Sequence, residues 1–132
     1  MNTPSQDMGH QGLPTLLGLE ITRRERGLTE GHLRLRPELM APNGYLHAGT
    51  VVTLADSCAG YGCIASLPDG AQSFTTIELK SNFLGTARDG EIHCRAVLAH
   101  GGRTTQVWDA EVRHGDKVIA MFRCTQMILY PR

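Results

Sequence analysis

The sequence has no excess of charge of either sign, because 13 lysine and arginine residues balance 13 aspartate and glutamate residues. Proteins that bind nucleic acid usually carry a basic excess or a basic stripe. The balance therefore disfavours this class, and we expect no nucleic-acid partner.

Targeting signals and long hydrophobic runs are also missing. The first residues, MNTPSQDMGHQG, are polar and lack the basic start and apolar run of a secretory signal peptide. The longest mostly apolar stretch, residues 48–65, is interrupted by Asp56, Ser57 and several glycines, which disfavours a membrane span. We expect a cytoplasmic protein with no membrane partner.

Motifs for metal binding are absent as well. The six histidines show no HExxH spacing, and no two of the four cysteines form a CxxC pair. In a reducing compartment, isolated cysteines are typically core residues. We therefore expect no metal site, and we interpret the cysteines as core residues: Cys58, Cys63, Cys94 and Cys124.

No signature of a nucleophilic serine or cysteine is present. A GxSxG elbow is missing, and Ser57 stands beside Asp56 in a helical stretch instead of on a sharp turn. Cys58 and Cys63 lack a recognisable local motif. A serine or cysteine hydrolase is therefore disfavoured.

The chain does contain enough apolar residues for a core. Hydrophobic residues make up 41% and charged residues 20% of 132 residues, as is typical of one globular domain. We expect residues 1–12 to form a disordered arm and residues 13–132 to form a single domain. Residues 16–36 contain two strand-like runs separated by Gly27.

Residues 48–66 have a helical pattern of a particular kind. They carry one charge, and small or apolar residues occupy every side of the helix. A helix that is apolar all round is typically buried. Four strand-like stretches follow, at 73–84, 91–99, 104–114 and 117–129, with turn sequences between them.

This order of elements predicts an α+β fold. Strands joined by short turns form an antiparallel sheet, and one buried helix must pack against a face of that sheet. We expect the sheet to wrap around one long central helix at about residues 48–66. The remaining face and edges need cover, so we expect a homodimer or a dimer of dimers.

Asp56 is the one charged side chain in the predicted buried helix. A carboxylate in apolar surroundings is costly and its pKa tends to rise, which is typical of site residues. The alternative is a carboxylate that caps a backbone group or pairs with an arginine. At the helix start, unbonded N–H groups attract developing oxyanions, and the small residues Ala48 and Gly49 allow a carbonyl to approach. The alternative for Ala48 and Gly49 is that they are small only because the start of the helix packs closely.

The stretch NGYLHAGTVVTLAD resembles the start of the central helix in hotdog-fold acyl-CoA thioesterases, particularly the phenylacetate-pathway (PaaI-like) branch. That family has a loop asparagine, then His-Gly-Gly, then Asp or Glu eight residues after the first glycine. This chain has Asn43, His47-Ala48-Gly49 and Asp56 at that spacing, with Ala48 in place of the first glycine. The later segment FTTIELKSNFLGTARDGE is similar to the family's strand after the helix.

The resemblance implies hydrolysis of an acyl-CoA thioester, with coenzyme A as part of the substrate and no separate cofactor. It implies that the backbone N–H of Ala48 polarises the carbonyl, and that Asp56 activates water or attacks directly. His47 and Asn43 would shape the helix start, and the Thr75 hydroxyl would help to place the water.

Strand alternation predicts that Thr75 shares a face with Ile77, Leu79 and Phe83. The alternative is that Thr75 is an ordinary β-branched strand residue. The phosphates of coenzyme A require basic side chains. Our candidates are Arg88, Arg103 and Lys80, each of which could equally be a solvated surface charge.

Two other function classes remain open. Hotdog-fold enoyl hydratases carry an Asp-x-x-x-x-His motif, and Asp109 and His114 have that spacing. On an alternating strand, however, an odd separation places the two side chains on opposite faces. A non-catalytic acyl-CoA-binding module is the other alternative, although it would gain little from a buried Asp56.

The spacing of Ala48 and Asp56 predicts a shared site. Eight residues span about 12 Å along a helix, so one helix cannot easily present both groups to one thioester carbon. We expect a two-fold homodimer that pairs Ala48 of one chain with Asp56 of the other.

Overall fold

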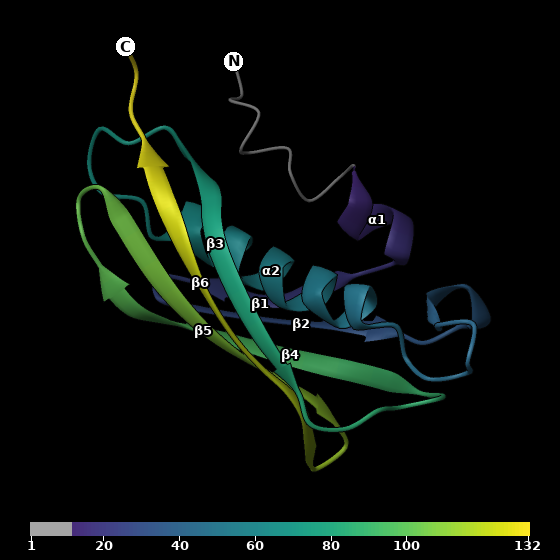
Figure 1. Cartoon of the computed structure of the whole chain (residues 1–132). Helices are drawn as coiled ribbons and strands as arrows, with labels where there is room; N and C mark the ends of the chain where they lie inside the picture. Colours follow the sequence, from purple (N-terminus) through teal and green to yellow (C-terminus); the bar gives the residue numbers. More distant parts are fainter. Residues whose placement is uncertain (1–11) are drawn as a thin grey trace.

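The computed structural model describes residues 12–132 (Figure 1). Most of the predicted arm at residues 1–12 therefore lies outside the described residues. The helices are α1 (Leu13–Leu17) and α2 (Ala48–Ala65), with a 3-10 turn at Pro37–Leu39. The strands are β1 (Glu20–Glu25), β2 (Leu28–Arg34), β3 (Ser73–Phe83), β4 (Glu91–Gly101), β5 (Thr105–His114) and β6 (Lys117–Leu129).

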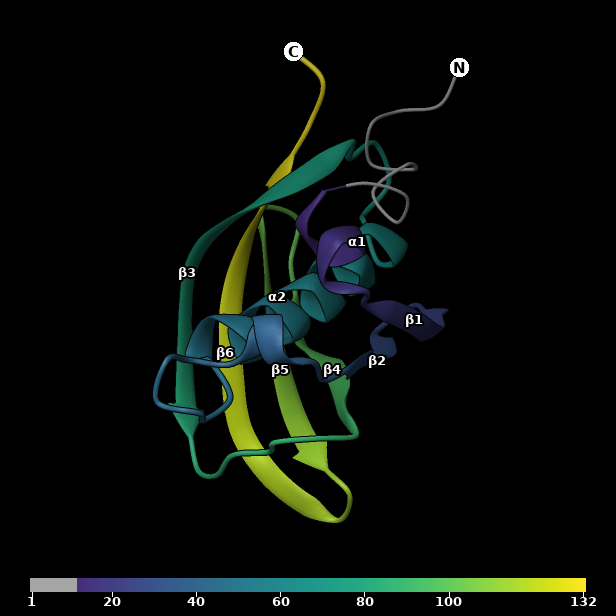
Figure 2. The ribbon, with the colours of Figure 1, turned by 90° about the vertical axis from the view of Figure 1, so that its right-hand side faces the viewer.

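The six strands form one antiparallel sheet in the order β1-β2-β4-β5-β6-β3. Helix α2 runs along one face of this sheet, and the sheet curves around it (Figures 1 and 2). The predicted α+β architecture with one central helix is confirmed. The strands after the helix also agree with the prediction, with ends that differ by at most two residues.

The core lies between α2 and the concave face of the sheet. Side chains from the helix meet fully buried side chains of the strands, which include Leu33, Ile92, Trp108 and Val112. Burial of a large apolar side chain stabilises the fold by roughly 1.5–3 kcal/mol. The four cysteines are buried and unpaired, as predicted for core residues. Within residues 12–132, no helix is both long and apolar enough to cross a membrane.

Gly62 explains how closely α2 approaches the sheet. A Cβ atom added at this residue would lie 2.5 Å from the Trp108 ring and 2.5 Å from the Thr29 hydroxyl oxygen. No side chain fits in that space, so α2 can pack this closely against the strands only with a glycine at this position.

The short helix α1 was not predicted from the sequence. Pro14 stands in its first turn, where a missing N–H costs no helical hydrogen bond. Gly18 ends the helix with a φ of 83°, in the left-handed region that favours glycine. The first strand consequently begins at Glu20 and not near residue 16.

Strand β3 contains a bulge at Ile77. Thr76 pairs with Gln126 and Glu78 pairs with Thr125, so one residue of β3 has no counterpart in β6. A bulge reverses the alternation of side chains on its two sides. The prediction that Thr75 shares a face with Leu79 is therefore wrong. Thr75 is exposed on the opposite face, and Thr76 points toward α2 instead.

Candidate functional site

The start of helix α2 presents one unused backbone donor. His47 is the N-cap, and its Nδ1 accepts a hydrogen bond of 2.7 Å from the N–H of Gly49. The N–H of Thr50 donates to the His47 carbonyl oxygen at 3.0 Å. The exposed N–H of Ala48 has no acceptor among residues 12–132. This donor therefore stands free at the positive end of the helix dipole.

The loop before the helix is organised by Asn43. Its side-chain oxygen accepts a hydrogen bond of 3.2 Å from the N–H of Tyr45, which closes a tight turn around Gly44. The next N–H, of Leu46, donates to the Thr86 hydroxyl at 3.1 Å. Asn43 thus shapes the path of the chain into the helix, and a direct contact of Asn43 with a thioester stays a prediction.

Asp56 lies near the middle of α2 and faces strand β3. Its Oδ1 atom is buried and has no hydrogen-bond partner within the described chain. Burial raises the pKa of this carboxyl, and the nearby Thr76 hydroxyl offsets part of that effect. The alternative in which Asp56 caps a backbone group or pairs with an arginine is not observed. The carboxylate is left available for chemistry.

A row of polar side chains continues from Asp56 into the core. Thr76 donates a hydrogen bond of 2.7 Å to Oε1 of Gln126, and Nε2 of Gln126 donates to Sγ of Cys124 at 3.5 Å. Gln126 and Cys124 are fully buried. Burial raises the pKa of Cys124 to about 12, so this group remains a thiol.

Sequence reasoning missed both Thr76 and Gln126. Thr76 was overlooked because the bulge depends on the pairing of β3 with β6, which a single strand sequence does not display. Gln126 gave a usable signal, since it is an uncharged polar residue on the core face of an otherwise apolar strand. Buried polar groups of this kind are almost always hydrogen-bonded to a specific partner.

The three basic candidates for coenzyme A lie apart from one another. The guanidinium carbon of Arg88 is 5.1 Å from the centroid of the Tyr45 ring, beside the loop that leads into α2. Arg103 stacks on Tyr130 at 5.4 Å in the turn after β4. Because Arg88 precedes β4 and Arg103 follows it, the whole strand separates them.

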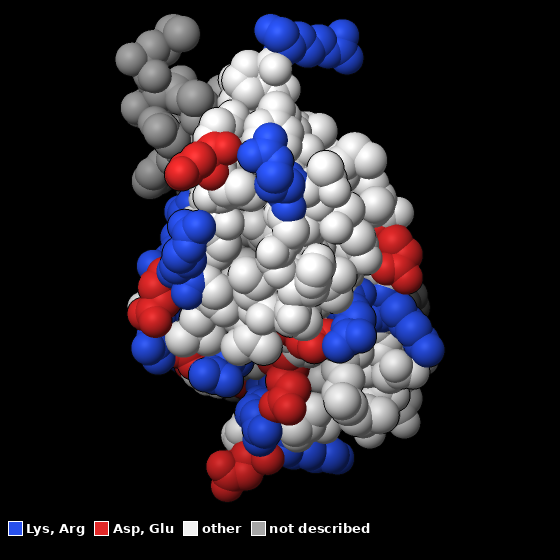
Figure 3. All heavy atoms as spheres, turned by 90° about the vertical axis from the view of Figure 1, so that its left-hand side faces the viewer, with Lys and Arg blue, Asp and Glu red and all other residues white. Residues whose placement is uncertain are grey.

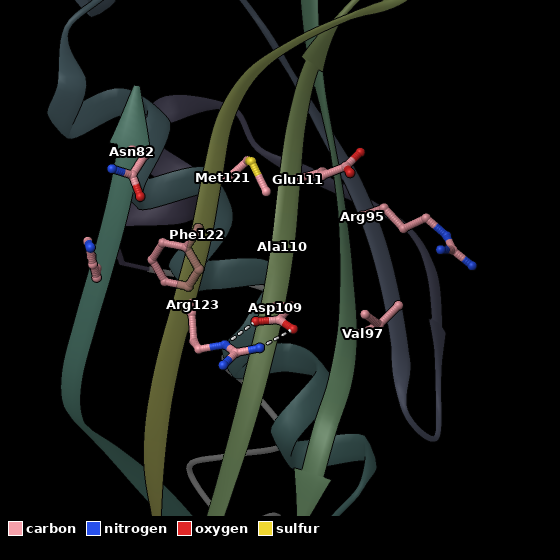
Figure 4. A pocket seen from close by; sticks show the side chains of 10 residues that line it. Asn82, Arg95, Val97, Asp109, Ala110, Glu111, Met121, Phe122 and Arg123 are labelled. Carbon is pink, nitrogen blue, oxygen red and sulfur yellow. Dashed lines mark hydrogen bonds and ion pairs between the residues drawn. The ribbon is translucent and has the colours of Figure 1, made fainter. Parts of the chain in front are cut away.

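Lys80 lies on the convex face of the sheet, away from α2. It lines a pocket of about 480 Å³ on that face, together with residues of β4, β5 and β6 (Figure 4). In this pocket Arg123 forms an ion pair with Asp109, with nitrogen–oxygen distances of 2.5 and 2.8 Å. Figure 3 shows acidic and basic side chains close together on this side of the molecule.

The hydratase motif is not assembled in the structure. Asp109 is engaged with Arg123 on the convex face. His114 lies at the end of β5, where its Nε2 is 3.0 Å from the carbonyl oxygen of Asp89. The two side chains therefore do not converge on one site, in agreement with their predicted opposite directions.

No metal-binding group is assembled in the described part of the chain. Among residues 12–132, no three His, Cys, Asp or Glu side chains converge in a way that could hold a metal ion. The groups that the described residues bring to the site are the backbone N–H of Ala48, the carboxylate of Asp56 and the hydroxyl of Thr76.

Known proteins are similar to this chain in sequence and in structure. The family model of the thioesterase superfamily matches residues 43–120, a span that contains the helix start, Asp56 and Thr76. The chain is 31% identical over 115 residues to 1,4-dihydroxy-2-naphthoyl-CoA hydrolase of Listeria monocytogenes, covering 86% of this chain and 93% of that protein.

Two solved structures are similar over nearly the whole chain. A conserved protein from Pseudomonas aeruginosa is 32% identical with a TM-score of 0.87, covering 96% of this chain and 100% of that one. A thioesterase family protein from Silicibacter pomeroyi is 31% identical with a TM-score of 0.86, covering 96% of each chain.

Proposed function

The chain belongs to the thioesterase superfamily and has its hotdog fold, and from that premise we propose that it hydrolyses an acyl-CoA thioester to a carboxylic acid and coenzyme A. The observation that carries this proposal is the pair of unused groups on α2. Ala48 offers an N–H without an acceptor, and Asp56 offers a buried carboxylate oxygen without a donor. Hydrolysis of a thioester needs one group of each kind.

The proposed chemistry follows from the position of each group. The N–H of Ala48 donates to the carbonyl oxygen, and this hydrogen bond strengthens as the oxygen becomes negative. Asp56 takes a proton from water or attacks the carbonyl carbon itself. Its raised pKa makes it a stronger base than an exposed aspartate. The hydroxyl that helps to place the water is that of Thr76 and not that of Thr75.

We propose that the complete site needs two copies of the chain. Ala48 and Asp56 are about 12 Å apart along α2. Strand β3 is an edge strand of eleven residues, and three of its apolar side chains are exposed: Ile77 by 51%, Leu79 by 40% and Phe83 by 47%. A long apolar edge of this kind is usually covered by another chain. Pairing through β3 would set two α2 helices side by side, so that Ala48 faces Asp56 of the partner subunit.

Arg88 is the best placed of the three candidates to bind a phosphate of coenzyme A. It lies beside Tyr45, close to the start of α2, so a thioester bound at Ala48 would extend its coenzyme A past this side chain. For Arg103 and Lys80 the same role requires that a second subunit bring them to the site. The acyl group we propose is aromatic, because the relative from Listeria monocytogenes is a hydrolase of an aromatic acyl-CoA.

The experiment that tests the function is a screen of acyl-CoA thioesters with detection of free thiol. Aromatic and straight-chain acyl groups are compared, and Asp56→Asn is the matched control. We expect thiol release by the wild type and its loss in the variant. A 3-hydroxyacyl thioester formed from an unsaturated acyl-CoA would identify a hydratase. Binding of acyl-CoA with no turnover of any substrate would identify a binding module.

A further inference from the structure

The hydroxyl group of Thr76 has a single proton and two acceptors within reach. One is Oε1 of Gln126, at 2.7 Å. The other is the carboxylate of Asp56, whose pKa is lowered by a hydrogen bond from the same hydroxyl. Only one of the two can receive the proton at a time. The acceptor that receives it determines whether Thr76 donates a hydrogen bond to Asp56 or is free to accept one from water.

The orientation of the Gln126 amide decides that choice. Its Nε2 donates to the sulfur of Cys124 at 3.5 Å, which turns Oε1 toward Thr76. Gln126 and Cys124 are fully buried, so no water competes for these bonds. An amide enclosed on all sides exchanges its two ends only by breaking both bonds without compensation. The Thr76 proton is therefore directed mainly to Gln126.

A second observation agrees with this direction. Oδ1 of Asp56 is buried and has no hydrogen-bond donor in the described part of the chain. If Thr76 gave its proton to Asp56, the carboxylate would gain a stabilising donor. Instead the carboxylate competes with Gln126 for the single proton of this hydroxyl.

We propose that Gln126 is a positioning residue, which takes the Thr76 hydroxyl proton and so turns Thr76 into an acceptor for the water that Asp56 activates. The inference rests on the proposed function of Asp56. One hydrogen of the water is accepted by the Asp56 carboxylate, and the other is accepted by Oγ1 of Thr76. The oxygen lone pair of the water is then directed away from both groups, toward the thioester carbon.

The reaction step is balanced with these groups alone. The water oxygen forms a bond to the carbonyl carbon while Asp56 takes one water proton. The electron pair of the carbonyl bond moves to the oxygen that the Ala48 N–H stabilises. Collapse of this intermediate breaks the carbon–sulfur bond, and the proton on Asp56 passes to the departing thiolate of coenzyme A. Thr76 and Gln126 exchange no proton in this sequence.

Few other groups around Asp56 could produce the same effect. Desolvation and the Thr76 hydroxyl of β3 account for the shift in its pKa, with no contribution from a charged side chain. From β6, the thiol of Cys124 responds to the charge of Asp56, but its pKa of about 12 keeps it neutral. Glu78 of β3 hydrogen-bonds to Thr125 on the convex face of the sheet.

The test is a double-mutant cycle between Gln126→Met and Thr76→Val, read by the pKa of the Asp56 carboxyl. Methionine is close to glutamine in size but cannot accept the proton, so Thr76 becomes free to donate to Asp56. Carbon-13 NMR of labelled aspartate measures the pKa, and Asp56→Asn identifies the resonance. In Gln126→Met we expect the pKa of Asp56 to fall by about one pH unit, the scale of one added hydrogen bond.

The Thr76→Val background distinguishes a redirected Thr76 proton from a general disturbance of core packing by Gln126→Met. With Thr76→Val there is no hydroxyl to redirect, so adding Gln126→Met should leave the pKa of Asp56 unchanged. The same fall in both backgrounds would mean that water enters the core, and would overturn the proposal. Because Thr76 shares its one proton between Gln126 and Asp56 and gives it mainly to Gln126, Thr76→Val alone should raise the pKa of Asp56 by well under about one pH unit. A rise of about one pH unit or more would show that Thr76 donates mainly to Asp56 in the wild type, and would overturn the proposal even if Gln126→Met does not fold.

Activity supplies an independent reading. The acid limb of the pH profile of kcat/KM for an acyl-CoA thioester should move to lower pH in Gln126→Met and should not move in the double variant. Thr76→Ser keeps the hydroxyl and serves as the conservative control, with a wild-type acid limb. The NMR titration needs no substrate. If no thioester is cleaved, the proposed function fails while the coupling of Gln126 to Asp56 is still decided.

Discussion

The N–H of Ala48 and Oδ1 of Asp56 are a donor without an acceptor and an acceptor without a donor on one helix. An unsatisfied buried polar group costs roughly 1–3 kcal/mol, so a fold tuned only for stability would have little reason to keep this carboxylate.

Replacement of Asp56 by asparagine should abolish catalysis and preserve the fold. The variant keeps the size of the side chain and removes its charge and basicity. We expect turnover of the preferred thioester to fall by at least roughly a hundredfold, the scale of a positioned base. Thiol release measures turnover, and circular dichroism confirms folding. Near-wild-type turnover by a folded variant would remove Asp56 from the site.

Mixed dimers test whether Ala48 and Asp56 act across two subunits. Ala48→Pro removes the N–H at the first helical position, where proline is tolerated and no hydrogen bond is lost. Each of the variants Asp56→Asn and Ala48→Pro should be nearly inactive by itself. In a mixed dimer one site collects both defects and the other has neither, so random assembly should restore about a quarter of the sites.

The readout is thiol release after the two inactive variants are unfolded together and refolded. Each variant refolded alone is the control. If mass spectrometry of the intact complex finds mixed dimers but activity does not return, donor and carboxylate belong to one chain.

The raised pKa of Asp56 predicts how stability depends on pH. In the folded protein this carboxyl retains its proton above the ordinary value of 3.8. The folded state therefore binds more protons than the unfolded state between that value and the raised pKa. The favourable contribution is complete below 3.8 and is lost as pH rises through the folded pKa.

Thermal unfolding of wild type and Asp56→Asn at several pH values measures this effect. The asparagine variant should gain stability relative to the wild type as pH rises through this window. At pH values well below 3.8 the difference in stability between the two should no longer change with pH. A difference in Tm that stays constant across the window would contradict a raised pKa of Asp56.

His47 should stabilise the start of α2 through its side chain. Its Nδ1 accepts the Gly49 N–H at 2.7 Å, so His47→Ala leaves that donor without a partner. Loss of an N-cap typically costs about 1 kcal/mol. His47→Asn can restore the bond, since asparagine is a favourable N-cap. Chemical denaturation measures the stability of both variants. Equal losses of stability in the alanine and asparagine variants would show that the His47 ring stabilises the fold through other contacts and not through the N-cap hydrogen bond.

The sequence predicts the central helix and the four strands after it closely, because these elements depend on patterns within one segment. Asp56 was recognisable for the same reason: a single charge in an apolar helix stands out without knowledge of the partner strands. The free N–H of Ala48 follows from its place at the start of a helix.

The hydroxyl beside Asp56 could not be placed in the same way. Thr75 and Thr76 are adjacent and chemically identical, so their assignment depends wholly on strand parity. The bulge at Ile77 is set by pairing with β6, fifty residues farther along the chain. The position of Arg88 near the helix start likewise arises from tertiary contacts with Tyr45, which no local pattern encodes.

The bulge in β3 also determines where the chain tolerates a change of length. Ile77 is the residue without a counterpart in β6, so its removal would restore a regular ladder while Thr76 still faces the helix and Glu78 still faces outward. Loss of a residue elsewhere in β3 would instead move the side chains of one part of the strand to the opposite face of the sheet. During evolution, insertions and deletions in this strand should therefore concentrate at Ile77, and homologous chains one residue shorter at this point can keep the same hydroxyl beside the carboxylate.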